Sequence, residues 1–171
     1  MFRNIPYLTM TVVLLLLQIF VLDELSIALW IRPMLFPLIV MLLPMELRTI
    51  WVLLASLGVG VVMDVALGGA GLYTATLLPL VVLRHWVMYI TTGRSVEFGD
   101  QSSLLSRLPL RQLMIYATAM LGLHHTMFFL LETLSFISPL RLIATIVLST
   151  LMSVVMAWPI LRLFLSKIVV K

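Results

Sequence analysis

The sequence predicts an all-α membrane protein: one integral membrane domain over residues 1–171, a polytopic bundle of six transmembrane helices. Its composition is the first reason, because 63% of the 171 residues are hydrophobic, only 11% are charged, and the mean hydropathy is +1.20. Soluble domains are about half apolar, so one of this length has no interior large enough for these side chains. The second reason is that several runs approach the ~20 apolar residues that cross a bilayer as a helix.

The expected spans follow the apolar runs. They are residues 5–22, 33–45, 49–67, 71–90, 112–137 and 140–165. The second run is short and contains Pro33, Pro37 and Pro44. As a helix it covers ~20 Å of a hydrocarbon core ~30 Å thick, so it either borrows residues 27–32 or stays short and kinked.

Basic residues near the span ends predict the orientation. Six spans put both chain ends on one side, and with the N-terminus inside, nine basic residues face the cytoplasm: Arg3, Arg48, Arg84, Arg94, Arg107, Arg111, Arg162, Lys167 and Lys171. Only Arg32 and Arg141 face outwards, so the positive-inside rule predicts cytoplasmic N- and C-termini. Arg84 is expected to extend from the end of the fourth span to the headgroups. The polar segment 91–111 is expected to be an inner loop with a short interfacial helix near residues 102–108.

Composition also excludes several functions. The chain has no cysteine, which excludes disulfides and thiol catalysis. Its net charge of +4 is explained by orientation and by anionic lipid headgroups, so no nucleic acid is predicted as a partner. The first apolar run lacks a small-x-small cleavage site, so we interpret it as a retained span rather than a signal peptide.

The stretch Gly60–Leu72 combines an intramembrane carboxylate with a glycine-rich turn. Ser56, Gly60, Asp64 and Gly68 recur in steps of four, so they share one helix face. Small residues beside a charge on one face are typical of a close helix–helix seam in lipid. The glycines expected to turn the chain are Gly68, Gly69 and Gly71.

The sequence leaves three structural interpretations of Asp64. The turn is so short that the carboxylate can accept hydrogen bonds from the free N–H groups that begin the next helix, near Gly71–Thr74, where the helix dipole favours an anion. Alternatively, Asp64 pairs with His124 or His125, or it contacts a partner protein. A role in chemistry is the least favoured reading of a charge at this depth.

Four further polar side chains lie within the predicted spans: Gln18, His124, His125 and Glu132. All lean towards the outer leaflet, so with Asp64 they predict an outward-opening polar patch shared by the first, third and fifth spans. Adjacent helical residues point about 100° apart, so the histidine pair is not a metal site, and interhelical hydrogen bonding is expected. Glu132 either joins this patch or simply reaches the outer interface.

Catalysis has little support in the sequence. No serine lies in a GxSxG motif, and no HExxH is present. A dyad of Ser149 or Ser153 with His124 is a minor alternative. Two stripes of small residues at steps of four are expected to pack helices: Thr118, Gly122 and Thr126, and Thr145, Ser149, Ser153 and Ala157. We therefore predict a protein that is not an enzyme and holds no metal or cofactor.

The chain resembles the MreD family of bacterial rod-shape-determining membrane proteins over nearly its whole length. The resemblance rests on Asp64 in a third span, the turn Gly68–Leu72, and the run GLYTATLLPLVV that opens the fourth span. The stretch HHTMFFLLETLSF, His124–Phe136, is similar to a variant in one branch of the family.

That resemblance implies a non-enzymatic role in the bacterial cytoplasmic membrane, beside MreC, the actin-like MreB, the glycosyltransferase RodA and a class B penicillin-binding protein. Together these guide peptidoglycan insertion along the side wall. The outer half, shaped by Asp64 and the turn, is expected to hold the membrane-proximal part of MreC, and the loop 91–111 is expected to make cytoplasmic contacts. The family also resembles in fold the substrate-binding subunit of energy-coupling-factor vitamin transporters, which supplies the alternative: an outward-facing vitamin pocket.

Overall fold

The computed structural model describes residues 5–23, 31–94, 104–133 and 138–168, and the regular secondary structure within these ranges is helical. The elements are α1 (Ile5–Leu17), the π-helical turn η2 (Gln18–Leu22), α2 (Pro37–Leu42), α3 (Thr49–Leu67), α4 (Leu72–Thr92), the short 3₁₀ helix η3 (Leu104–Arg107), α5 (Leu110–Glu132) and α6 (Pro139–Ile168). The all-α prediction is therefore confirmed for the described residues.

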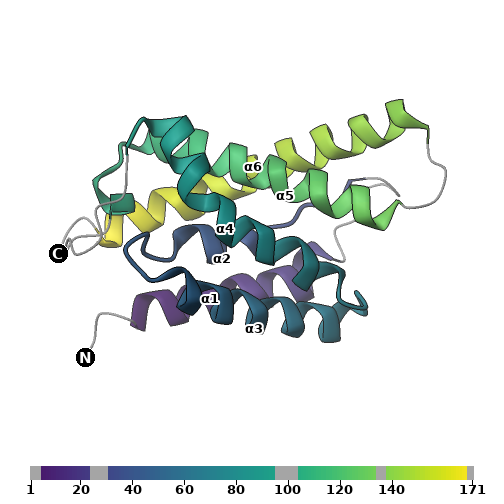
Figure 1. Cartoon of the computed structure of the whole chain (residues 1–171), viewed down its shortest axis with the longest axis horizontal. Helices are drawn as coiled ribbons and strands as arrows, with labels where there is room; N and C mark the ends of the chain where they lie inside the picture. The colour runs from purple at the N-terminus through teal and green to yellow at the C-terminus, as the bar shows by residue number, and fades with distance from the viewer. Residues whose placement is uncertain (1–4, 24–30, 95–103, 134–137, 169–171) are drawn as a thin grey trace.

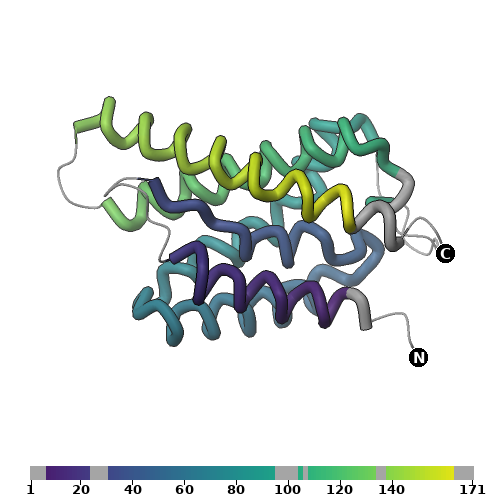
Figure 2. The backbone as a smooth tube through the Cα atoms, turned by 180° about the vertical axis from the view of Figure 1, so that it is seen from behind, coloured from purple at the N-terminus to yellow at the C-terminus, as the bar shows by residue number. Residues whose placement is uncertain are grey.

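The long helices pack in chain order, α3 on α4, α4 on α5 and α5 on α6, and each runs opposite to the one before it (Figure 1). The beginning of α1 and the last turns of α6 lie at the same end of the bundle in both views (Figure 2). We call it the basic end, because Arg48, Arg94 and Arg111 lie at helix ends there and Arg162 lies in the last two turns of α6. The opposite end, with the turn 68–71, is the glycine end.

Four of the predicted spans are helices long and apolar enough to cross a membrane: α3, α4, α5 and residues 139–163 of α6. The third has the predicted bounds, 49–67. The prediction of six transmembrane helices is wrong, because the first two expected spans are not helices of crossing length. The first predicted span is an apolar helix below the usual crossing length, α1 continued by η2 through Leu22. The second is mostly not helical.

The second predicted span, 33–45, contains only the six-residue helix α2, and residues 31–35 run into it without helical turns (Figure 2). Proline is the local reason. Pro33 disfavours a helical conformation at the residue before it, Pro37 begins α2 at a position where its missing N–H costs nothing, and Leu43 turns extended (ψ 142°) ahead of Pro44.

This broken segment is the centre of the molecule. Every residue from Met34 to Leu42 is buried, whereas α3 and α6 expose broad apolar faces such as those of Trp51, Leu54 and Val155. Lipid is the medium that suits such exposed faces, and non-helical backbone at membrane depth is tolerated only where protein surrounds it. The four long helices and α1 therefore enclose a stretch of chain that lipid itself would not accept.

Candidate functional site

Asp64 joins α3 to α4 through the start of the second helix. Its Oδ1 accepts the N–H of Tyr73 at 3.0 Å, and its Oδ2 accepts the N–H of Thr74 at 3.0 Å and the Thr74 hydroxyl at 2.6 Å. These N–H groups lie in the first turn of α4, where backbone N–H groups have no hydrogen-bond acceptor within the helix. The first interpretation of Asp64 is therefore the one that the structure shows, and the pairing with His124 or His125 is not formed.

Glycine is required on both sides of this junction. A Cβ on Gly60 would lie 2.7 Å from the Cα of Thr74, so α3 and α4 touch backbone to backbone there. A Cβ on Gly69 would collide with the Tyr73 ring and lie 2.6 Å from Oδ1 of Asp64. Gly68 and Gly71 take positive φ angles of 70° and 93°, which suit glycine, and they turn the chain into α4.

Side chains from both sides hold the non-helical segment before α2. Gln18 accepts the N–H of Leu35 at 2.7 Å and donates to the carbonyl of Pro33 at 3.2 Å. From α6, Ser153 accepts the N–H of Met34 at 2.9 Å, and Ser149 accepts the N–H of Arg32 at 3.2 Å. The stripe of small residues on α6 thus packs as expected and also supplies hydrogen bonds that a helix would have made internally.

His125 and Ser153 form a buried pair whose donors can be assigned. His125 Nδ1 lies 2.7 Å from the Leu121 carbonyl, so in the neutral ring this nitrogen carries the proton. Nε2 is then the acceptor for the Ser153 hydroxyl, 3.3 Å away. The dyad of a serine with His124 is therefore not formed, because the histidine beside Ser153 is His125. Because Ser153 Oγ also receives the Met34 N–H, residues 31–36 cover this hydroxyl, and the pair holds the segment in place.

His124 faces α4 instead. Its Nε2 lies 3.3 Å from the Thr76 hydroxyl, which donates to the carbonyls of Leu72 and Tyr73, so the ring donates to Thr76. The rings of Phe36 and Phe128 pack against it. His124 Nδ1 is buried without a hydrogen-bond partner among the described residues. The two adjacent histidines therefore serve different interhelical contacts, as their angular separation predicts.

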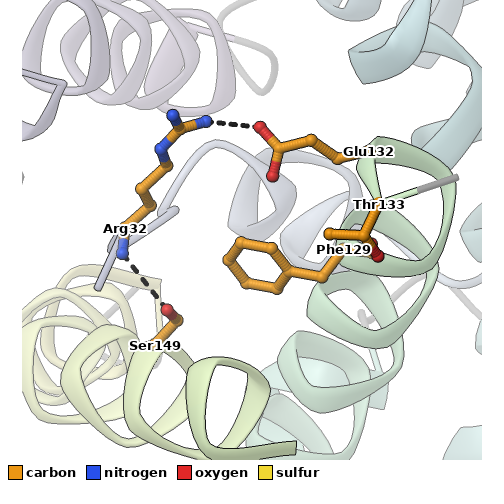
Figure 3. A network of polar contacts seen from close by, with 5 residues as sticks. All are labelled: Arg32, Phe129, Glu132, Thr133 and Ser149. Carbon is orange, nitrogen blue, oxygen red and sulfur yellow. Dashed lines mark hydrogen bonds and ion pairs between the residues drawn. The ribbon is translucent and has the colours of Figure 1, made fainter. Parts of the chain in front are cut away.

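Arg32 and Glu132 form an ion pair at the glycine end, with 2.6 Å between Nη1 and Oε1 (Figure 3). The two side chains are 49% and 32% exposed, so Glu132 reaches the rim of the bundle. Figure 3 also shows how Arg32 links two helices, with its guanidinium on Glu132 of α5 and its backbone N–H on Ser149 of α6. Exposed pairs contribute only about 0–1 kcal/mol, so this contact positions the segment more than it stabilises it.

Arg84 does not extend to the headgroups, and that prediction is wrong. The side chain is fully buried and turns inwards to the end of α2, where Nη2 donates to the Pro44 carbonyl at 2.9 Å. Nη1 lies 3.4 Å from the carbonyls of Val40 and Leu43. The last carbonyls of a helix lack internal partners and carry partial negative charge, so the guanidinium caps α2 from outside.

The predicted outward-opening patch is therefore a set of internal contacts. Gln18, Asp64, His124, His125 and Glu132 each bond to another segment of the chain, and they gather in the half of the bundle towards the glycine end. The sequence did not predict that Arg84 caps the end of α2 or that Arg32 links α5 to α6. The available signal was the shortness of the proline-containing run, which implies backbone groups in need of partners.

Comparisons with protein-family models, with curated proteins and with solved structures gave no match. Among the described residues, no group of three or more histidine, aspartate or glutamate side chains is arranged to hold a metal ion. Any statement about function therefore depends on the residues and their geometry.

Proposed function

We propose that this chain is a non-enzymatic membrane scaffold of the bacterial cell-wall elongation machinery, which binds MreC and supports rod shape. The resemblance of Asp64, the glycine turn and the run after it to the MreD family suggests the system. The geometry favours a scaffold within it. One observation supports a scaffold most strongly: all five predicted polar side chains form hydrogen bonds between segments of the same chain.

The proposal includes six crossings, two of them unconventional. Residues 5–22 cover ~27 Å as helix. Residues 31–35 cover up to ~17 Å if extended, and residues 36–42 add ~10 Å as helix, so together they approach a hydrocarbon core of ~30 Å. An even number of crossings agrees with the beginning of α1 and the end of α6 at one end of the bundle.

The basic end is the cytoplasmic end in this proposal. Removing the buried Arg84 from the nine inner cations leaves eight, against Arg32 and Arg141 at the other end, so the positive-inside rule still favours this orientation. The glycine end then faces outwards and offers the turn 68–71 and the Arg32–Glu132 pair to the membrane-proximal part of MreC. MreB, RodA and the penicillin-binding protein are reached indirectly.

Co-purification with MreC tests the function. We expect MreC to be retained by the tagged wild-type chain, and at least fivefold less by Ala70→Glu, which places a charge at the exposed tip of the turn. Ala70→Gly is the matched control, because Ala70 has a positive φ of 48° that glycine adopts without strain. Failure of the wild-type chain to retain MreC, together with normal cell shape after its depletion, contradicts the proposal. Micromolar binding of a vitamin by the purified chain would favour the transporter alternative.

A further inference from the structure

The face of α5 that points away from the bundle carries a hollow near the basic end. It is shallow and largely open, with a volume of about 490 Å³. The described residues that line it are Arg111, Met114, Ile115, Thr118 and Ala119. They alternate along α5 with the buried residues Leu113, Tyr116, Ala117 and Met120, so the hollow opens away from the bundle core.

The depth of the hollow follows from the register of α5 against α6. Gly122 lies against Thr150, with 3.8 Å between a Cβ built there and the threonine methyl group. The helices run in opposite directions at equal rise, so Arg111 lies level with residues 161–162. Arg162 is exposed and its guanidinium lies 5.8 Å from the ring centre of Trp158. Arginine and tryptophan gather at the headgroup level of a bilayer, so this level marks the headgroups.

The rest of the hollow then lies among the acyl chains. Residues 114–119 begin about 4.5 Å and end about 12 Å deeper than Arg111 along the helix. Thr118 is the polar residue in this part. Its hydroxyl donates to the Met114 carbonyl at 2.8 Å, so it needs no hydrogen-bond acceptor from a ligand. The site therefore has one cation at headgroup depth and an apolar hollow directly below it.

We propose that this hollow binds one anionic phospholipid, with its phosphate on Arg111 and an acyl chain along Met114, Ile115, Thr118 and Ala119. Charge decides the lipid class, because the guanidinium favours an anionic headgroup, and a basic residue near the membrane surface attracts anionic lipids. The site does not depend on MreC or on the proposed function.

Native mass spectrometry of the purified chain tests the site, with phosphatidylglycerol and phosphatidylcholine as probes. We expect the wild type to retain one phosphatidylglycerol at least fivefold more often than phosphatidylcholine. Arg111→Gln should remove this preference, and Thr118→Phe should lower retention of both lipids by filling the hollow. Arg94→Gln is the matched control, because Arg94 is exposed at the same end but does not line the hollow. Equal retention of both lipids by the wild type, or an equal loss in Arg94→Gln, overturns the proposal.

A photocrosslinker identifies the occupant without disturbing Arg111. With p-benzoylphenylalanine in place of Ile115, which is 44% exposed, illumination of native membranes should add the mass of a phospholipid to the chain. An adduct with another protein, or with a second copy of this chain, overturns the proposal in favour of a helix-docking surface.

Discussion

Arg84→Met is expected to destabilise the fold by about 3 kcal/mol, because buried acceptors left without partners cost about 1–3 kcal/mol each. Methionine keeps much of the length of the arginine side chain but donates no hydrogen bonds. The buried carbonyl of Val40 and the partly buried carbonyls of Leu43 and Pro44 would then lose the guanidinium that caps them. Unfolding of the purified protein by a denaturing detergent measures the loss.

The control for this prediction is Arg94→Met, since Arg94 is exposed two residues beyond α4. It should unfold at the wild-type detergent fraction. Arg84→Lys should fall between the two, because an ammonium group lacks the planar fork that reaches several carbonyls together. An Arg84→Met variant as stable as Arg94→Met would show that the cap contributes nothing.

Asp64→Ala is expected to cost about 2–4 kcal/mol, because it leaves the N–H groups of Tyr73 and Thr74 unpaired at a helix start that favours an anion. Asp64→Asn retains one carbonyl oxygen and should lose about half as much. The same detergent titration measures both variants. Wild-type stability of Asp64→Ala would show that the carboxylate contributes nothing to the α3–α4 junction.

Two glycines on α3 provide a matched steric test of that junction. Gly60→Ala forces a methyl group against Thr74 and should cost about 1–3 kcal/mol, as overpacking does. A Cβ on Gly58, two residues away, would have no atom within 4 Å. Gly58→Ala should therefore be neutral or stabilising, because alanine favours a helix by up to ~1 kcal/mol over glycine. Equal effects of the two changes would mean that α3 and α4 do not approach closely at Gly60.

The sequence predicts best what depends on neighbours along the chain. The bounds of α3 and the α3–α4 hairpin follow from an apolar run, a carboxylate and a glycine turn within about 20 residues. The contact between Asp64 and the start of α4 could be expected for the same reason, since a short turn leaves the carboxylate beside those N–H groups.

The features that the sequence did not predict depend on contacts between residues far apart in the chain. The prolines keep residues 31–35 out of a helix, but Ser149 and Ser153, more than 100 residues away, accept the N–H groups of Arg32 and Met34, and no local pattern encodes that pairing. Arg84 reads as an interfacial residue from its position in the fourth span. Its role becomes visible only when the end of α2 lies beside it. The histidines were expected to bond between helices, but which serine or threonine each meets depends on the packing of α5 against α4 and α6.

The most direct test of the account asks whether the broken segment 31–42 crosses the membrane. Since the chain has no cysteine, Asp23→Cys and Leu47→Cys each create a single labelling site on either side of that segment. In intact spheroplasts treated with an impermeant maleimide, we predict that Asp23→Cys is labelled at once and that Leu47→Cys is labelled only after permeabilisation. Labelling of both positions from the same side would contradict a buried, partly unwound crossing at the centre of this bundle.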